Sequence, residues 1–177
     1  MSTEMEVNDW LDLLVLDSIA EPSDKVAECE FFLSLAKKEI NPDKFRWLTS
    51  AFFGAAYSYF EITALRSYVE FQSPEDGAYI ENAEALNVLR SHVRVFQNAK
   101  RPTFVKTAGY SEITKTLYDL RKQNIHHYPQ SIMVEDESPP NGFYFGSLKG
   151  KGIHALNFCI QVMSTINEVE HELKNHW

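Results

Sequence analysis

The segment from Arg121 to Tyr128 concentrates residue types that can perform acid–base chemistry on a phosphate. It holds a guanidinium, two imidazoles and a phenol within eight residues. An arginine can bind a phosphate through two parallel N–H donors and stabilise charge that develops on it. A histidine near the negative end of a helix favours the imidazolium form, which suits a general acid. Arg121 and His126 together therefore fit attack of a ribose 2′-hydroxyl on the adjacent phosphate, with no metal required.

The spacing of these two residues sets a condition on that chemistry. At about 100° per residue, His126 lies about 140° round an ideal helix from Arg121, whereas Tyr128 lies nearly over Arg121 two turns later. One straight helix therefore does not direct Arg121 and His126 the same way. The helix stop at Pro129, the length of the arginine side chain, or a second subunit must bring them together.

The charge distribution favours a local phosphate-binding surface over broad nucleic-acid binding. The net charge of the 177-residue chain is −8, and non-specific binding to nucleic acid needs a cationic face. The stretch from Lys100 to Lys122 nevertheless holds six lysines and arginines against two acids, Glu112 and Asp119. The protein is therefore acidic overall, and residues 100–122 are the stretch that could bind a phosphate.

At the Arg121 segment the sequence resembles the HEPN superfamily, a group of helical-bundle proteins. Its ribonuclease members carry an arginine followed, a few residues later, by a histidine. The match here is Arg121, four residues and His126, and it extends to the longer form Arg-x4-His-x-Tyr through Tyr128. The upstream stretch from Arg46 to Phe60, which mixes small and aromatic residues, is similar to the long central helix of that superfamily.

The resemblance implies a homodimer in which two Arg/His motifs face each other across a cleft and cut RNA without a cofactor, often as a toxin or defence protein. Arg121 would bind the scissile phosphate and His126 would act as general acid and base. Asn124 and Tyr128 would orient them, and His127 is the weaker candidate for the histidine role. A partner implied for some members is a nucleotidyltransferase-type antitoxin, which would modify Tyr128.

Four lysines are expected to bind RNA phosphates: Lys115, Lys122, Lys149 and Lys151. Lys122 follows Arg121 directly, where the superfamily often has Asn, Asp or His. Lys149 and Lys151 belong to a glycine-rich stretch before the last predicted helix, whose backbone N–H groups also suit a phosphate.

Two other interpretations stand beside the ribonuclease. The first is a catalytically inactive HEPN-like binding or scaffold protein, in which Arg121 and His126 are only helix-end and surface charges. The second is a zinc site at His171 and His176, but these histidines are five residues apart and do not share a helix face as H-E-x-x-H requires. We therefore expect neither a metal nor a cofactor.

The expected fold is a single all-α domain over residues 1–177, with five or six helices and a small β-hairpin or flap before the last one. Apolar residues recur at helical spacing, which predicts helices over residues 5–20, 22–40, 43–72, 75–98, 112–127 and 152–174. Asn41 and Ser111 are expected to cap the third and fifth helices. Residues 99–110 are expected to form a polar, basic connection.

The remaining sequence features predict the cellular setting. No apolar run approaches the length of about 18 residues that a membrane helix needs, and the acidic start of the chain is unlike a signal peptide. We therefore expect a cytoplasmic protein. Cys29 and Cys159 lie among apolar neighbours in predicted helices, which is typical of buried thiols.

Overall fold

The computed structural model describes residues 21–69, 71–72, 79–80, 82–98, 100–126, 130–135, 138–146 and 152–176. The helix predicted over residues 5–20 lies outside this set. Within it, the chain forms five helices and three small antiparallel sheets. The protein is therefore mostly helical, as expected, but it is not all-α.

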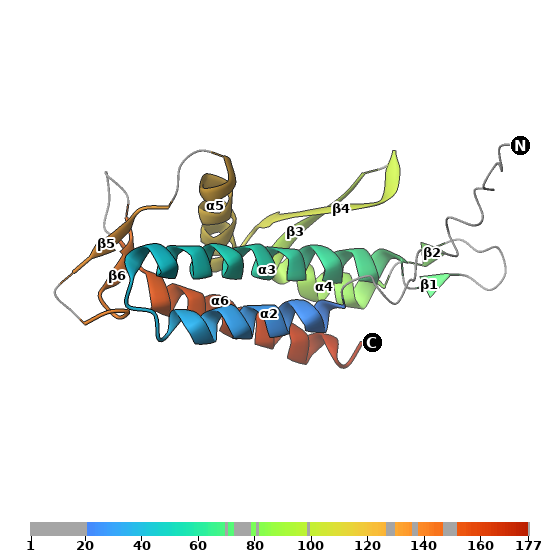
Figure 1. Ribbon diagram of the computed structural model, residues 1–177. Coiled ribbons are helices and arrows are strands. Elements are labelled where there is room, and N and C mark those ends of the chain that lie inside the picture. The colour runs from blue at the N-terminus through green and yellow to red at the C-terminus, as the bar shows by residue number, and fades with distance from the viewer. Residues whose placement is uncertain are drawn as a thin grey trace, which may run out of the picture.

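The long helix α3 (Pro42–Val69) is the element against which most of the others pack. Figure 1 shows α2 (Pro22–Ala36) and α6 (Ala155–Leu173) on one side of α3, and α5 (Glu112–His126) on the other. The shorter α4 (Ala83–His92) also contacts α3 and α6. This arrangement separates the face that carries α5 from the face that carries α2.

Each sheet is a small local unit. Strands β1 and β2 pair, β3 pairs with β4, and β6 lies between β5 and β7. Their bounds are Phe71–Gln72, Tyr79–Ile80, Val93–Asn98, Arg101–Gly109, Ile132–Val134, Phe143–Phe145 and Ile153–His154, in order from β1 to β7. The hairpin predicted before the last helix is confirmed as β5 and β6, with Val134 opposite Phe143.

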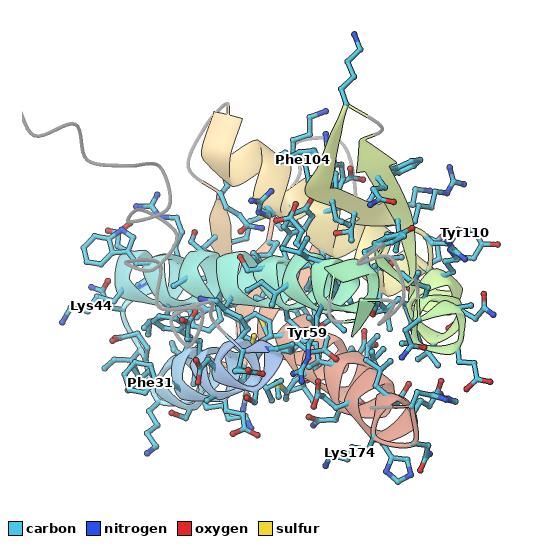
Figure 2. The ribbon with its side chains drawn as sticks, turned by 90° about the vertical axis from the view of Figure 1, so that its right-hand side faces the viewer. Phe31, Lys44, Tyr59, Phe104, Tyr110 and Lys174 are labelled. Carbon is cyan, nitrogen blue, oxygen red and sulfur yellow. The ribbon has the colours of Figure 1, made fainter. Side chains whose placement is uncertain are left out.

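The core is built on the aromatic side chains of α3, the helix predicted over residues 43–72. Fully or nearly fully buried on it are Phe45, Phe52, Phe53, Tyr59 and Phe60, and Figure 2 shows Tyr59 near the middle of the molecule. Each such side chain contributes about 1.5–3 kcal/mol through burial. Although α3 is long, neither it nor any other described helix is long and apolar enough to cross a membrane.

Two helix-level predictions are confirmed in detail. The Asn41 side chain accepts hydrogen bonds from the backbone N–H groups of Asp43 and Lys44, at 3.0 and 3.1 Å, and so caps α3. Cys29 and Cys159 are both buried and unpaired. Burial, and then the nearby Glu28 carboxylate, raises the pKa of Cys29 to about 12, so its thiol stays protonated and acts as a small apolar group.

The helix predicted over residues 75–98 is confirmed over Ala83–His92 and wrong on either side, where Tyr79–Ile80 forms strand β2 and Val93–Asn98 forms strand β3. Helix α4 ends at His92 and the chain continues as strand β3, while the predicted connection at residues 99–110 is largely strand β4. The stretch Val93-Arg94-Val95-Phe96 fits both a helical spacing and the period of two that a strand requires. Pairing with β4, with Val93 opposite Gly109, decides the conformation.

The end of this hairpin is tied to the start of α5 through Thr114. Its hydroxyl donates to the His92 carbonyl oxygen at 2.6 Å and accepts from the Tyr110 backbone N–H at 3.0 Å. The Ser111 hydroxyl accepts from the Thr114 N–H at 3.3 Å, which confirms Ser111 as the cap of α5. The β3–β4 hairpin and α5 are therefore held as one unit.

We expect Gly109→Ala to lower the free energy of unfolding by about 1–3 kcal/mol, the usual cost of overpacking. A Cβ at this position would lie 2.2 Å from the Lys115 Cα, where the helix passes against the hairpin. The matched control is Gly54→Ala on α3, where nothing lies within 4 Å and the helix gains about 0.5–1 kcal/mol. Urea unfolding measures the change in free energy of unfolding for both variants. Equal changes would contradict the close approach of Gly109 to the Lys115 backbone.

Candidate nucleic-acid interface

Arg121 extends from α5 onto the ring of Tyr57 in α3. Its guanidinium carbon lies 3.8 Å from the ring centroid, a distance typical of strong cation–π contact. The Tyr118 ring lies 6.0 Å from Tyr57, centroid to centroid. The Arg121 Nε is buried without a hydrogen-bond partner among the described residues. The guanidinium is therefore stacked on the Tyr57 ring, and its Nε makes no hydrogen bond to a described residue.

Tyr57 connects the three elements that meet here. Its hydroxyl donates to the Thr107 carbonyl oxygen of β4 at 2.7 Å, while its ring carries Arg121 of α5. Burial, and then the negative charge of Glu61, raises the pKa of Tyr57 to about 12. Tyr57 therefore stays neutral and fixes α5 and β4 relative to α3.

Glu61 lies one helical turn after Tyr57 and is half-buried. Burial raises the pKa of its carboxyl above the usual value, and attraction to Arg121 is the largest effect that opposes this rise, with Lys106 also contributing. Glu61 therefore lies in the field of two cations that belong to α5 and β4. Reasoning from the sequence missed it, although it is the one acid between Asp43 and Glu70.

We expect Glu61→Gln to change how stability depends on pH. A carboxyl whose folded-state pKa is raised contributes stability at pH values below its unfolded pKa, and this contribution is lost as pH rises through the folded pKa. Between pH 4 and pH 7 the variant should therefore gain free energy of unfolding relative to the wild type. Urea unfolding at both pH values measures this, with exposed Glu112→Gln as control. If the difference in free energy of unfolding between the variant and the wild type is the same at pH 4 and pH 7, the Glu61 carboxyl is exposed to solvent.

The outer face of the β3–β4 hairpin carries aromatic and cationic side chains together. Phe96 lies opposite Lys106 in the strand register, and alternation along β4 places Phe104 on the same face. The rings of Phe96, Phe104 and Tyr110 are 48–57% exposed. The guanidinium of Arg94 lies 5.5 Å from the Tyr110 ring centroid. We name this surface the hairpin face, and it consists of Arg94, Phe96, Phe104, Lys106 and Tyr110.

Exposed aromatic rings beside cations are the elements of a single-stranded nucleic-acid surface, because bases stack on the rings while phosphates approach the cations. Figure 1 shows the hairpin and α5 on the same side of α3, and Figure 2 shows Phe104 and Tyr110 at the periphery. Lys106 links the two parts, since it belongs to the hairpin face and acts on Glu61 together with Arg121. The hairpin face and α5, which carries Arg121, lie on the same side of α3, and together they are the candidate interface.

The structure describes some of the predicted site residues and not others. Lys122 and Lys115 are exposed on α5, with the Lys115 ammonium 3.9 Å from the Glu112 carboxylate. Helix α5 continues through His126, so the positions of Arg121 and His126 lie about 140° apart around an ideal helix. The side chains of Asn124 and His126, and the whole of His127, Tyr128, Lys149 and Lys151, lie outside the described part of the chain.

The possible zinc motif at the C-terminus has another role in the structure. The His176 ring Nδ1 lies 3.0 Å from the Glu84 carboxylate, and the His176 carbonyl oxygen accepts from the Asn82 side chain at 3.1 Å. His176 therefore joins the end of α6 to the start of α4. Among the described residues no three His, Cys, Asp or Glu side chains gather as metal ligands would.

Comparisons with known proteins do not test the resemblance to the HEPN superfamily, because they found no match. No known protein family matches this chain. Comparisons with curated proteins and with solved structures also found no match. What supports a function is therefore the chemistry of the Arg121 segment and of the hairpin face.

Proposed function

We propose that this protein is a metal-independent endoribonuclease of the HEPN type that acts on single-stranded RNA. Two observations carry the proposal: the guanidinium of Arg121 stacks on Tyr57, and the hairpin, with its exposed aromatic rings, lies on the same side of α3 as α5. Bases that stack on Phe96 and Phe104 bring the phosphates between them towards Lys106 and Arg121. The guanidinium then stabilises the charge that develops on the phosphate.

In the proposed reaction, a histidine accepts the proton of a ribose 2′-hydroxyl and the O2′ attacks the adjacent phosphorus. The bond to the 5′-oxygen then breaks, and this oxygen takes up a proton from an imidazolium. The products are a 2′,3′-cyclic phosphate and a 5′-hydroxyl. Because Arg121 and His126 diverge on one helix, we assign the histidine of each site to the second chain of a homodimer. A nucleotidyltransferase-type partner that modifies Tyr128 stays a prediction.

The test is incubation of single-stranded RNA with the purified protein in EDTA, followed by analysis of the product ends. We expect cleavage to continue in EDTA, to leave cyclic phosphate and 5′-hydroxyl ends, and to spare DNA of the same sequence, which lacks the nucleophile. Loss of cleavage on adding EDTA, or equal cleavage of DNA, would reject the proposed mechanism.

The second candidate function is binding of RNA without cleavage, as in an inactive HEPN-like scaffold. The helical backbone through His126 favours it, because an ideal helix sets positions 121 and 126 about 140° apart. The hairpin face, in turn, needs no histidine to bind RNA. The two functions separate in one experiment, since only the first consumes the RNA that it binds.

Both functions predict that Phe96→Ala and Phe104→Ala each weaken RNA binding by about 5- to 150-fold, because stacking of a base on an aromatic ring is worth about 1–3 kcal/mol. Fluorescence anisotropy of a labelled RNA measures this in EDTA, in a His126→Ala background that removes cleavage. The matched control is Phe31→Ala, which removes a ring on α2, outside the hairpin face, and should leave affinity unchanged. If all three variants bind equally, the hairpin face is not the RNA surface.

A further inference from the structure

The junction of α2 and α3 exposes large apolar side chains on the side away from the hairpin face. They are Phe31, Leu35, Ile40 and Trp47, with exposed fractions of 40–70%, and we name them the elbow patch. A groove of about 420 Å³ lies between the two helices and is lined by Leu35, Lys38, Glu39, Lys44, Trp47 and Leu48. Figure 2 shows Phe31 and Lys44 on the same side of the molecule. Apolar side chains that gather in this way mark a site of interaction.

Helix α2 carries two apolar stripes and buries only one of them among the described residues. Cys29, Leu33 and Ala36 face the core. Ala27, Phe31 and Leu35 follow one another at intervals of four residues, form a second stripe, and are exposed. A helix that is apolar on two faces is normally covered on both.

The rim of the groove is mainly positive. Lys38 and Lys44, which line the groove, and Lys37, next to Lys38 in the sequence, are exposed, and no described carboxylate lies within ion-pair distance of them. Glu39, the acid that lines the groove, accepts a hydrogen bond from the Asn41 backbone N–H at 2.8 Å. A partner that fits the elbow patch should therefore be apolar on one face and acidic on its margins.

We propose that residues 1–20 of the same chain cover the elbow patch. This segment has no lysine or arginine, and it has five acids, Glu4, Glu6, Asp9, Asp12 and Asp17. Its apolar residues, among them Trp10, Leu13, Leu14 and Ile19, recur at roughly helical spacing. It lies outside the described residues and ends immediately before Glu21, the cap of α2.

The length of the segment and the direction of the chain agree with this occupant. As a helix, residues 5–20 would span about 24 Å, and α2 spans about 22 Å. Pro22 disfavours a helical Glu21, whose backbone is extended at φ −64° and ψ 146°. The chain can therefore reverse there, and the two helices can run antiparallel as a hairpin if the end of the segment joins Glu21 in a loop of about two to five residues. Trp10 precedes Glu21 by nearly as many residues as Phe31 follows it, so the two rings would lie level.

The test measures how far Trp47 is accessible in the full-length chain. Trp10→Phe and Trp177→Phe leave Trp47 as the sole tryptophan, and acrylamide quenching then reports its exposure. We expect weak quenching in this background and several-fold stronger quenching after Leu13→Asp and Leu14→Asp, which remove the apolar face of the segment. Lys44→Glu should also increase quenching, whereas the control Lys174→Glu, at an exposed position on the far end of α6, should not. Equal quenching with and without the aspartates would overturn the proposal.

A second copy of the chain is the alternative occupant, and a mixing experiment separates it. The Trp47 reporter that carries the two aspartates is mixed with an excess of a Trp47→Phe chain whose segment is intact. Restored shielding of Trp47 would show that the segment covers another copy and would overturn docking within one chain. We expect no restoration. Neither result depends on RNA cleavage.

Discussion

Replacing His126 with alanine is expected to lower the rate of RNA cleavage by about 10²–10⁴-fold, the usual contribution of a general acid or base. The reason is that the 2′-hydroxyl then has no group to accept its proton, while RNA binding to the hairpin face persists. The measurement is single-turnover cleavage in EDTA. His127→Ala is the neighbouring control and should cost much less. Full activity in His126→Ala would remove this residue from the mechanism, and loss in His127→Ala alone would move the role to His127.

A mixture of two inactive variants tests the arrangement across the dimer. If each site combines Arg121 of one chain with His126 of the other, equal amounts of Arg121→Ala and His126→Ala chains form mixed dimers with one intact site. Half of the dimers are mixed and half of their sites are intact, so about a quarter of the wild-type activity should return. If both residues act within one chain, the mixture stays inactive.

Replacing Arg121 with alanine is expected to lower the cleavage rate by about 10²–10³-fold, because one aimed donor to the transition state is lost. Arg121→Lys should lose most of this activity as well. An ammonium cannot bind a phosphate through two parallel donors, and it cannot stack flat on Tyr57. Single-turnover kinetics measure the rate, and affinity for RNA is measured in parallel, since a loss confined to the rate indicates a contact made in the transition state.

Two matched variants control for indirect effects on Arg121. Lys122→Ala removes the neighbouring exposed cation and should weaken RNA binding only slightly. Tyr57→Phe removes the hydrogen bond to Thr107 but keeps the ring under the guanidinium, and should retain most of the activity. Wild-type rates in Arg121→Lys would show that a simple positive charge is enough, and would contradict the stacked, two-donor arrangement.

Periodicity and local capping residues were enough to locate most elements of this fold. Asn41 and Ser111 cap the helices that the sequence assigned to them, because a cap depends only on residues within one turn. The error over residues 75–98 has a different origin. Whether Val93–Phe96 forms a helix or a strand depends on a partner strand more than ten residues later, and a local pattern does not contain that information.

The candidate site also combines a residue that local sequence identifies with residues that only the tertiary fold brings together. Arg121 could be selected from its neighbours in sequence, but Tyr57 and Glu61 lie some sixty residues earlier and become part of the site only when α5 packs against α3. The hairpin face was missed because the residues that compose it were assigned to a helix and to a connection. Once β3 and β4 pair, alternation along each strand brings their aromatic and cationic residues to one side.

The proposed cleavage requires a phosphate held by Arg121 next to a ribose that attacks it. A DNA oligonucleotide with a single ribonucleotide, incubated in EDTA with wild type and with Arg121→Ala, tests this on one defined bond. We predict that the wild type cuts immediately 3′ of the ribonucleotide and leaves a 2′,3′-cyclic phosphate, while the variant leaves the oligonucleotide intact over the same time. Cleavage at equal rates by both proteins, or cleavage by the wild type at deoxyribose positions, would contradict it.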